Sequence, residues 1–270
     1  MDFRSLLPAP FLRRPARVAL LRLQGTIGAG RPGAAALSDA GLAPVIERAF
    51  AKGKPSAVAL LINSPGGSPV QSALIAARIR RLADEKKIPV HAFVEDVAAS
   101  GGYWLACAAD DIRADATSVV GSIGVISAGF GLDGFITRHG IERRVHTAGG
   151  SKSFLDPFRP EKPEDVARLT RLLEDMHVTF KAWVTERRGP RLSRDDLFTG
   201  DIWTGRQALE TGLIDGLGHA VPTLKEIYGA KVRLVPHGPR RSLLRRFGAE
   251  TLGAALETVE ERALWARYGL

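Results

Sequence analysis

Residues 57–67 read Ala-Val-Ala-Leu-Leu-Ile-Asn-Ser-Pro-Gly-Gly, a short apolar run that ends in a proline and two glycines. The apolar part predicts a buried strand, and the helical spacing of the apolar residues after the glycines predicts a helix. One face of this helix holds Val70, Leu74, Ile75, Ile79 and Leu82. A buried strand, a glycine turn and an amphipathic helix in this order predict one unit of a parallel sheet.

The same alternation extends along most of the chain. Further strands are predicted at 18–23, 89–94, around Ile112, and at 123–126 and 141–145. Further helices are predicted at 42–50, at 98–109, from Pro163 until Gly189-Pro190 stops the pattern, and at 252–263. Strands that alternate with amphipathic helices indicate parallel βαβ units and an α/β fold.

The composition is that of a globular protein, with 45% hydrophobic and 25% charged residues among 270. The single cysteine, Cys107, allows no intramolecular disulfide, and its alanine-rich neighbourhood indicates a small buried residue. No apolar run reaches the roughly 18–20 residues that span a bilayer. The first 17 residues hold charges and prolines where a signal peptide has its apolar run. We therefore expect a cytoplasmic protein.

Seven of the nine excess positive charges lie near the two ends of the chain. Residues 1–17 carry four arginines against Asp2, a net +3, and residues 236–247 carry four arginines, a net +4. Basic segments flanked by Leu and Phe suit either peripheral contact with an anionic membrane or a solvated tail. Nucleic acid is not an expected partner, because the basic residues are not interleaved with a stacking platform.

Ser100 is the first candidate for chemistry. It stands in Ala98-Ala-Ser-Gly-Gly-Tyr-Trp104, after a strand and at the start of an alanine-rich segment. The unpaired N–H groups of a helix N-terminus can hold an oxyanion while the hydroxyl attacks a carbonyl. The alternative is that Ser100 only caps the helix.

Gly66 and Gly67 end another predicted strand in the same way, and they could supply a second oxyanion donor. The alternative is an ordinary strand-to-helix turn. Because the carboxyl ends of parallel strands meet at one edge of a sheet, the turn with Gly66 and Gly67 is expected to lie beside the turn with Ser100 and Gly101.

A nucleophilic serine needs a base. None of the six histidines lies in a glycine-rich setting, whereas Lys152 lies in Gly149-Gly-Ser-Lys-Ser153 and precedes Phe154, Leu155 and Phe158. A lysine amine acts as a base only in its neutral form, which apolar surroundings favour. A solvated loop lysine is the alternative. No metal-ligand or phosphate-binding spacing is present, so we expect neither a metal nor a cofactor.

Five runs in register resemble peptidase family S49, the family of signal peptide peptidase A and SohB-type proteins. They are Asn63-Ser-Pro-Gly-Gly67, Ala98-Ala-Ser-Gly-Gly-Tyr103, Gly121-Ser-Ile-Gly-Val125, Lys152-Ser-Phe-Leu-Asp-Pro157 and Gly212-Leu-Ile-Asp-Gly-Leu217. The resemblance spans about residues 18–235. It implies a ClpP/crotonase-like fold, a spiral of ββα units.

The resemblance also implies site roles. Ser100 would be the nucleophile, Lys152 the base, and the Ser122 hydroxyl would orient the lysine amine, with oxyanion donors near Gly67 and Gly101. It implies hydrolysis of peptides, in particular hydrophobic or signal-peptide-like segments. It further implies a homo-oligomer, in which short members can share Ser and Lys between subunits.

This chain is of the short, single-domain size, and no transmembrane anchor is expected at its N-terminus. We expect a basic arm at 1–16, a peptidase domain at 17–236 and a basic amphipathic C-terminal helix within 237–270. Two other functions are compatible with the fold: a non-catalytic binding subunit, and an acyl-CoA enzyme of the crotonase type. The second would leave Lys152 without a role.

Overall fold

The structure is a computed structural model that describes residues 15–28, 36–238 and 264–269. In these residues eight strands form one sheet, in the order β6-β5-β3-β2-β1-β8, and in addition β4 pairs with β3 and β7 pairs with β4. The strands are β1 (Arg17–Gln24), β2 (Ala57–Ser64), β3 (Val90–Ala99), β4 (Asp111–Ala114), β5 (Val119–Gly121), β6 (Ile202–Thr204), β7 (Gly216–Leu217) and β8 (Arg233–His237). The α-helices are α1 (Asp39–Ala51), α2 (Pro69–Lys86), α3 (Gly101–Ala106), α4 (Asp133–Arg138), α5 (Pro163–Arg188), α6 (Gly205–Glu210) and α7 (Ala220–Tyr228).

Strand β3 is paired with different neighbours along its length. Its first half pairs in parallel with β4 and its last three residues pair in parallel with β5. On its other side it pairs with β2, and the register shifts between Ile62 and Ser64. The described ladders are parallel except that between β5 and β6. The carboxyl ends of β2, β3 and β5 therefore lie side by side.

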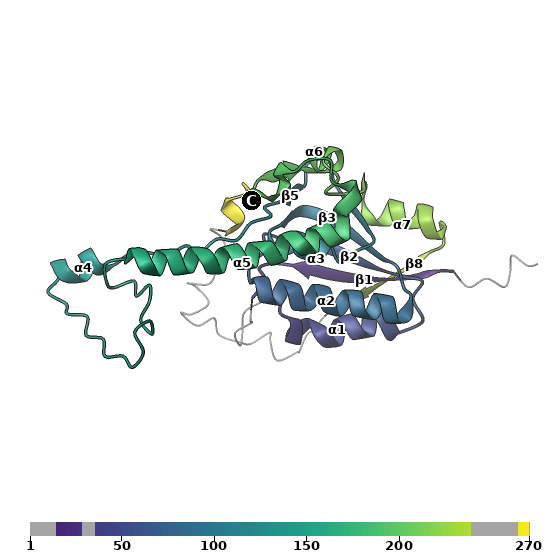
Figure 1. Cartoon of the computed structure of the whole chain (residues 1–270). Coiled ribbons are helices and arrows are strands. Elements are labelled where there is room, and N and C mark those ends of the chain that lie inside the picture. Colours follow the sequence, from purple (N-terminus) through teal and green to yellow (C-terminus); the bar gives the residue numbers. More distant parts are fainter. Residues whose placement is uncertain (1–14, 29–35, 239–263, 270) are drawn as a thin grey trace, which may run out of the picture.

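Alternate residues of the central strands face two different cores. Leu21, Leu60 and Ala92 belong to the larger core, which also takes in buried residues of α1, α2 and α3. Ala59 and Phe93 face the other side, where Leu224 of α7 covers the sheet. Figure 1 shows the same layers, with α1 and α2 on one face of the sheet and α7 on the other. The strands read as continuous apolar runs because both faces are covered.

Helix α5 is the exception to this compact arrangement. It has 26 residues, about 39 Å at 1.5 Å per residue, and its buried residues are only Phe180, Val184 and Arg188. Figure 1 shows that the chain after β5 runs away from the domain, beside α5, to α4. It then turns back and returns to the domain as α5. We call residues 126–176 the arm.

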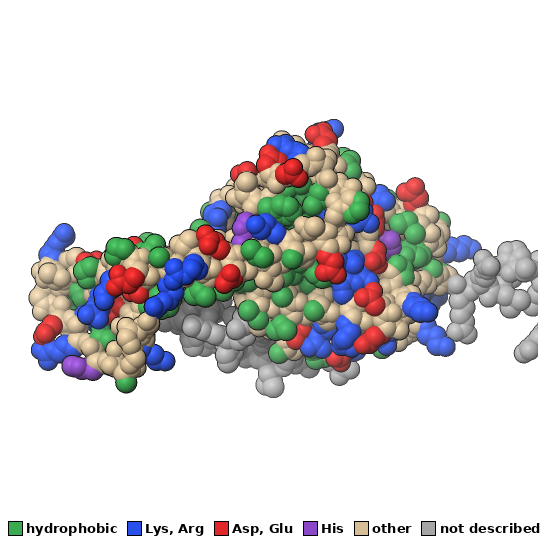
Figure 2. All heavy atoms as spheres, viewed as in Figure 1, with side chains coloured by type: hydrophobic (Ala, Val, Ile, Leu, Met, Phe, Trp, Pro, Cys, Tyr) green, Lys and Arg blue, Asp and Glu red, His purple; other side chains and the backbone are tan. Residues whose placement is uncertain are grey.

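The surface of the arm displays large hydrophobic side chains between charged ones (Figure 2). Phe130 is 86% exposed. Other exposed members of the set are Ile126, Phe135, Ile141, Leu172 and Met176. Exposed apolar surface of this extent is typical of a surface that another molecule covers.

The expected α/β sheet is confirmed, and strands and helices follow the predicted order through most of the chain. Three predicted segments differ. The helix at 98–109 begins only at Gly101, because Ala98 and Ala99 pair with β5. The run at 123–126 forms no strand, because the positive φ of Gly121 and Ser122 turns the chain out of the sheet. The run at 141–145 lies in the arm and is not paired with any described strand.

Two further expectations concern burial and the chain ends. On α2, Ile75, Ile79 and Leu82 are buried as an amphipathic face requires, whereas Val70 and Leu74 are 62% and 46% exposed. Residues 1–14 of the expected basic N-terminal segment and the expected C-terminal helix at 252–263 lie outside the described residues. Among the described helices, none combines the length and the apolar character needed to cross a membrane.

Candidate active site

Ser100 lies at the turn between β3 and α3, with an unusual backbone. Its φ and ψ are 51° and −121°, a region that residues with a Cβ rarely occupy. The Ser100 N–H donates to the Gly121 carbonyl at 2.8 Å, which ties the turn to the end of β5. Strain of this kind costs about 1–3 kcal/mol and persists where surrounding structure enforces it, often at functional sites.

The hydroxyl of Ser100 does not serve as a helix cap. Ser100 occupies the N-cap position of α3, but its side chain accepts no capping hydrogen bond. By contrast, Ser38 and Ser68 cap α1 and α2 through their hydroxyls. Ser100 is partly exposed at this position. Its hydroxyl is therefore available to an incoming group, which argues against the capping alternative.

Gly66 and Gly101 pack directly against Ser100, and Gly67 lies next to Gly101. A Cβ on Gly66 would lie 2.8 Å from the Ser100 Cβ, and a Cβ on Gly67 would lie 2.0 Å from the Ile27 carbonyl oxygen. A Cβ on Gly101 would lie 3.4 Å from the Gly67 nitrogen, so the two backbone N–H groups are neighbours. The Gly67 N–H has no acceptor among the described residues, and the first N–H groups of α3 have none within the helix.

The loop that carries Gly67 is held on both sides. The Ile27 N–H donates to the Gly66 carbonyl, and the Ser68 N–H donates to the Ile27 carbonyl, both at 2.8 Å. The Ser64 hydroxyl donates to the Gly25 carbonyl at 2.7 Å and accepts a longer bond of 3.3 Å from the Gly66 N–H. Two rigidly held N–H groups beside a serine hydroxyl can stabilise the oxyanion of a tetrahedral intermediate.

Ser122 lies at the end of β5, the strand next to β3. Ala99 and Gly121 are paired in the sheet, so Ser100 and Ser122 each follow one member of the pair. Ser122 also has a positive φ of 51°, and its N–H donates to the Asp201 carbonyl at 2.6 Å. The structure thus brings Ser100, Ser122 and the three glycines to one edge of the sheet.

Lys152 lies elsewhere in the chain. It belongs to the segment between α4 and α5, which Figure 1 shows at the end of the arm away from α3. The residue is exposed. A single copy of the chain therefore does not bring the amine of Lys152 to the hydroxyl of Ser100.

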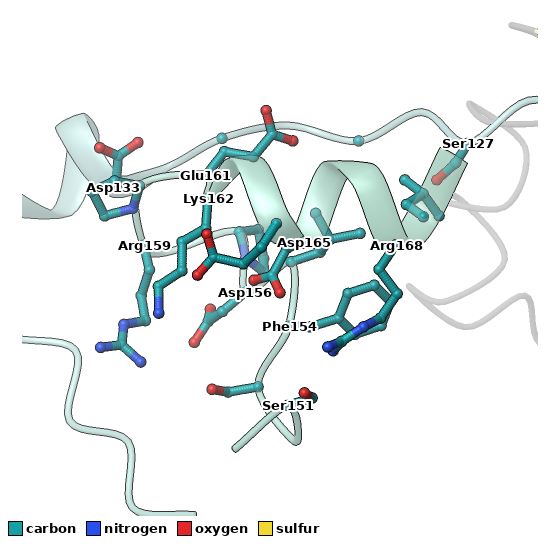
Figure 3. Close-up of a pocket in the computed structure, with 18 of the residues that line it drawn as sticks. Ser127, Asp133, Ser151, Phe154, Asp156, Arg159, Glu161, Lys162, Asp165 and Arg168 are labelled. Carbon is teal, nitrogen blue, oxygen red and sulfur yellow. The ribbon is translucent and has the colours of Figure 1, made fainter. Parts of the chain in front are cut away.

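A large cavity lies in the arm and not at Ser100. It has a volume of about 760 Å³, and its lining residues come from two stretches of the arm, within 127–133 and within 150–169. Figure 3 shows the charged side chains of Asp156, Asp165 and Arg168 around it, together with Phe154. Ser151 and Ser153 line this hollow but Lys152 does not. Because it contains no part of the Ser100 turn, this hollow is a feature of the arm and not of the candidate active site.

Cys107 and two of the histidines, His91 and His219, are held in other surroundings. Cys107 is fully buried, and burial raises the pKa of its thiol to about 12. His91 contacts Asp111 and Tyr228, and His219 contacts Asp115. In the described part of the chain no histidine forms a hydrogen bond with Ser100.

Several supporting residues were not predicted from the sequence. Ile27 holds the Gly67 loop, and the side chain of Asn63 contacts Asp96 at 2.5 Å and the Val97 N–H at 3.3 Å, where β3 shifts register. Asn63 stands in one of the glycine runs, so its position was a signal. Ile27 carries none, because only the fold brings it to Gly67.

Comparison with known proteins gives a family match. The family model described as Peptidase family S49 matches residues 83–230, more than half of the chain. This range includes Ser100, Ser122 and Lys152. It begins after the Gly67 loop, which the structure places beside Gly101.

Two related proteins differ in their names. A Brucella melitensis protein named Na(+)/H(+) antiporter NhaA is 48% identical over 99% of this chain and 39% of its own length. A Haemophilus influenzae protein named Probable protease SohB is 30% identical over 75% of this chain and 57% of its own length. The chain thus spans less than two thirds of either relative, and most of the antiporter-named protein lies outside the aligned part.

A solved structure supports the fold. The structure of a mutant of the 1510-N membrane-bound stomatin-specific protease matches with a TM-score of 0.51. The match covers 84% of this chain and all of that chain, at 15% sequence identity. At this identity the likeness concerns the fold alone, and it agrees with the mixed α/β domain described above.

Proposed function

Because the chain belongs to peptidase family S49, we propose that it is a serine peptidase with Ser100 as nucleophile and Lys152 as general base. The observation that carries the proposal is the turn at Ser100. Ser100 has a strained backbone, its hydroxyl does not cap α3, and it lies beside the N–H groups of Gly67 and Gly101. This arrangement suits attack on a carbonyl and has no purpose in capping α3.

The proposed reaction is acyl transfer. The neutral amine of Lys152 accepts the Ser100 proton while the Ser100 oxygen attacks the scissile carbonyl carbon. The N–H groups of Gly67 and Gly101 hold the resulting oxyanion. The ammonium then gives its proton to the departing amine nitrogen, and the amine next activates the water that hydrolyses the acyl-enzyme.

We propose that Lys152 serves the Ser100 of a neighbouring copy. The arm carries Lys152 away from its own α3, and the exposed apolar residues of the arm offer a surface for a second copy. Ser122, at the edge that holds Ser100, would receive the incoming amine and orient it through its hydroxyl. The active enzyme in this proposal is a homo-oligomer with shared sites.

The proposed substrates are peptides with apolar side chains near the cut, such as signal-peptide-like segments. Val70 and Leu74 are exposed on the first turns of α2, directly after the Gly67 loop. They offer an apolar surface beside the proposed oxyanion donors. A library of fluorogenic peptides would test this preference, and equal cleavage of charged and apolar peptides would contradict it.

We also propose peripheral contact with an anionic membrane at its cytoplasmic face through residues 1–17 and 236–247. The support is their net charge of +3 and +4. Flotation with anionic vesicles at low and high salt tests the proposal. Salt-sensitive flotation is expected, and its absence would leave these segments as solvated tails.

The peptidase proposal is tested by labelling with a fluorophosphonate, which reacts with activated serines, and by mapping the label with peptide mass spectrometry. We expect a label on Ser100 in the full-length protein, none in Ser100→Ala, and almost none in Lys152→Ala. Circular dichroism would establish that the variants fold. An unlabelled but folded wild-type protein would contradict the proposal and favour a binding subunit.

A further inference from the structure

Helix α5 leaves the core at His177. Its buried residues Phe180, Val184 and Arg188 recur every four residues, and His177 lies on the same face, one turn before Phe180. His177 is half-buried, whereas the preceding residue, Met176, is 42% exposed. Leu173, one turn earlier in this row, is also half-buried but already belongs to the arm, so His177 lies where the helix passes from the core into the arm.

At this point His177 contacts the loop that carries Ser122. Its Nε2 lies 3.1 Å from the carbonyl oxygen of Ile123, the residue after Ser122. A carbonyl only accepts, so Nε2 must carry a hydrogen, as it does in one neutral tautomer and in the charged ring. Ile123 itself is fully buried, which fixes its side chain while His177 fixes its carbonyl.

The other contacts of α5 go to different parts of the core. The Trp183 Nε1–H donates to the Trp104 carbonyl, and Arg187 donates to the carbonyls of Cys107 and Ala109. Arg188 donates to the Gly212 carbonyl. Among the hydrogen bonds of α5 with described residues, only the bond from His177 reaches the loop after β5.

Ser122 needs such restraints because its backbone is strained. The loop is held at its start by the bond between the Ser100 N–H and Gly121, and at Ser122 by the bond to the Asp201 carbonyl. The bond from His177 holds it on the far side of Ser122. A residue with a positive φ keeps that conformation only where its surroundings enforce it.

We propose that His177 is a positioning residue for catalysis, which acts by fixing the Ser122 hydroxyl where it meets the lysine amine of the neighbouring copy. The inference rests on the proposed function of Ser122 and Lys152. It gives α5 two tasks: it supports the arm whose preceding segment carries Lys152 toward one site, and it steadies Ser122 in the site of its own chain.

The test is a double-mutant cycle on the rate of fluorophosphonate labelling of Ser100 in the full-length protein. His177→Leu removes the donor, and we expect labelling about three- to tenfold slower, the range that one lost hydrogen bond allows. His177→Gln, which keeps an N–H donor, should recover most of the rate. In the Ser122→Ala background, His177→Leu should have no further effect, because the group on which it acts is gone.

Val184→Ala is the matched control, since it loosens the packing of α5 one turn after Phe180 and leaves the hydrogen bond from His177 to Ile123 in place. It should not reproduce the effect of His177→Leu. His177→Met is a second variant without a donor, should His177→Leu not fold. An equal loss in the wild-type and Ser122→Ala backgrounds, or no loss in either, would overturn the inference. Absence of Ser100 labelling in the wild type would instead overturn the proposed function.

Discussion

Two serines at the ends of adjacent strands share a positive φ, which is uncommon for residues other than glycine. Ser100 and Ser122 both have a φ of 51°, and the bond between the Ser100 N–H and Gly121 joins their turns. A serine that only needed to cap a helix would not require this conformation. The backbone at both residues is therefore consistent with a site in which each hydroxyl is turned toward a reacting group.

Gly67 gives a prediction at the scale of one atom. Gly67→Ala would place a Cβ 2.0 Å from the Ile27 carbonyl at a φ of +141°, so the loop must move and take its N–H with it. We expect Ser100 labelling to fall by about 10²–10³, the usual effect of losing one oxyanion donor. Gly238→Ala, where no atom lies within 4 Å, is the control. Normal labelling of folded Gly67→Ala would exclude Gly67 as a donor.

Cys107 gives a prediction about pH. Burial raises the pKa of its thiol from about 9 in the unfolded chain to about 12 in the fold. Between pH 9 and 12 the folded state keeps the thiol proton that the unfolded state releases. The stability that comes from burying the neutral thiol is therefore complete below pH 9 and declines as the pH rises from 9 to 12. Urea unfolding at pH 8 and pH 10.5 should show a larger loss of stability in the wild type than in Cys107→Ala. Equal losses would show that the thiol is not protected.

At the scale of elements, the sequence predicted the elements whose pattern is local. The apolar runs of β1, β2 and β3 and the glycines that end them were sufficient to predict a parallel sheet with Ser100 and Gly67 at one edge. The helix predicted at 98–109 begins only at Gly101 in the structure, because alanine is compatible with both helix and strand and pairing with β5 makes Ala98 and Ala99 part of the sheet.

Other features depended on tertiary structure that no local pattern contains. The apolar spacing of α5 predicts a helix, but it does not show that most of the helix lies outside the core. The run at 141–145 has the composition of a strand, yet in the arm no described strand pairs with it. The support of Gly67 by Ile27 and of Ile123 by His177 joins segments that are distant in sequence.

The base of α5 gives a prediction about stability. Arg188 is 1% exposed and forms a 2.7 Å ion pair with Asp215, which also pairs with Arg191 and accepts the Ile112 N–H. Asp215→Ala leaves a buried charge without its partner and should cost about 3–5 kcal/mol in urea unfolding. Arg188→Met should cost less, because Asp215 keeps its other partners.

An exposed ion pair on α2 is the control for this comparison. Arg81 and Glu85 form a pair in which both side chains are about half exposed. Glu85→Ala should change the free energy of unfolding by less than about 0.5 kcal/mol. A cost for Asp215→Ala as small as that for Glu85→Ala would contradict the view that the ion pair between Arg188 and Asp215 anchors α5 to the domain.

At the scale of the whole molecule, the proposed site is divided. The proposed nucleophile, the proposed oxyanion donors and Ser122 lie at one edge of the sheet, and the proposed base lies in an exposed arm with apolar side chains on its surface. An isolated copy has no neighbour to cover that surface. The proposal that copies share their sites explains both the distance of Lys152 from its own α3 and the exposure of residues such as Phe130.

Complementation between two inactive variants tests this account most directly. Differently tagged Ser100→Ala and Lys152→Ala chains are co-expressed, and oligomers that carry both tags are purified and labelled with the fluorophosphonate. If sites are shared, the label should appear on Lys152→Ala chains beside an intact lysine, reaching about a quarter of the wild-type level in a random one-to-one mixture. Mixed oligomers that remain unlabelled, while wild-type oligomers label fully, would contradict a site shared between copies.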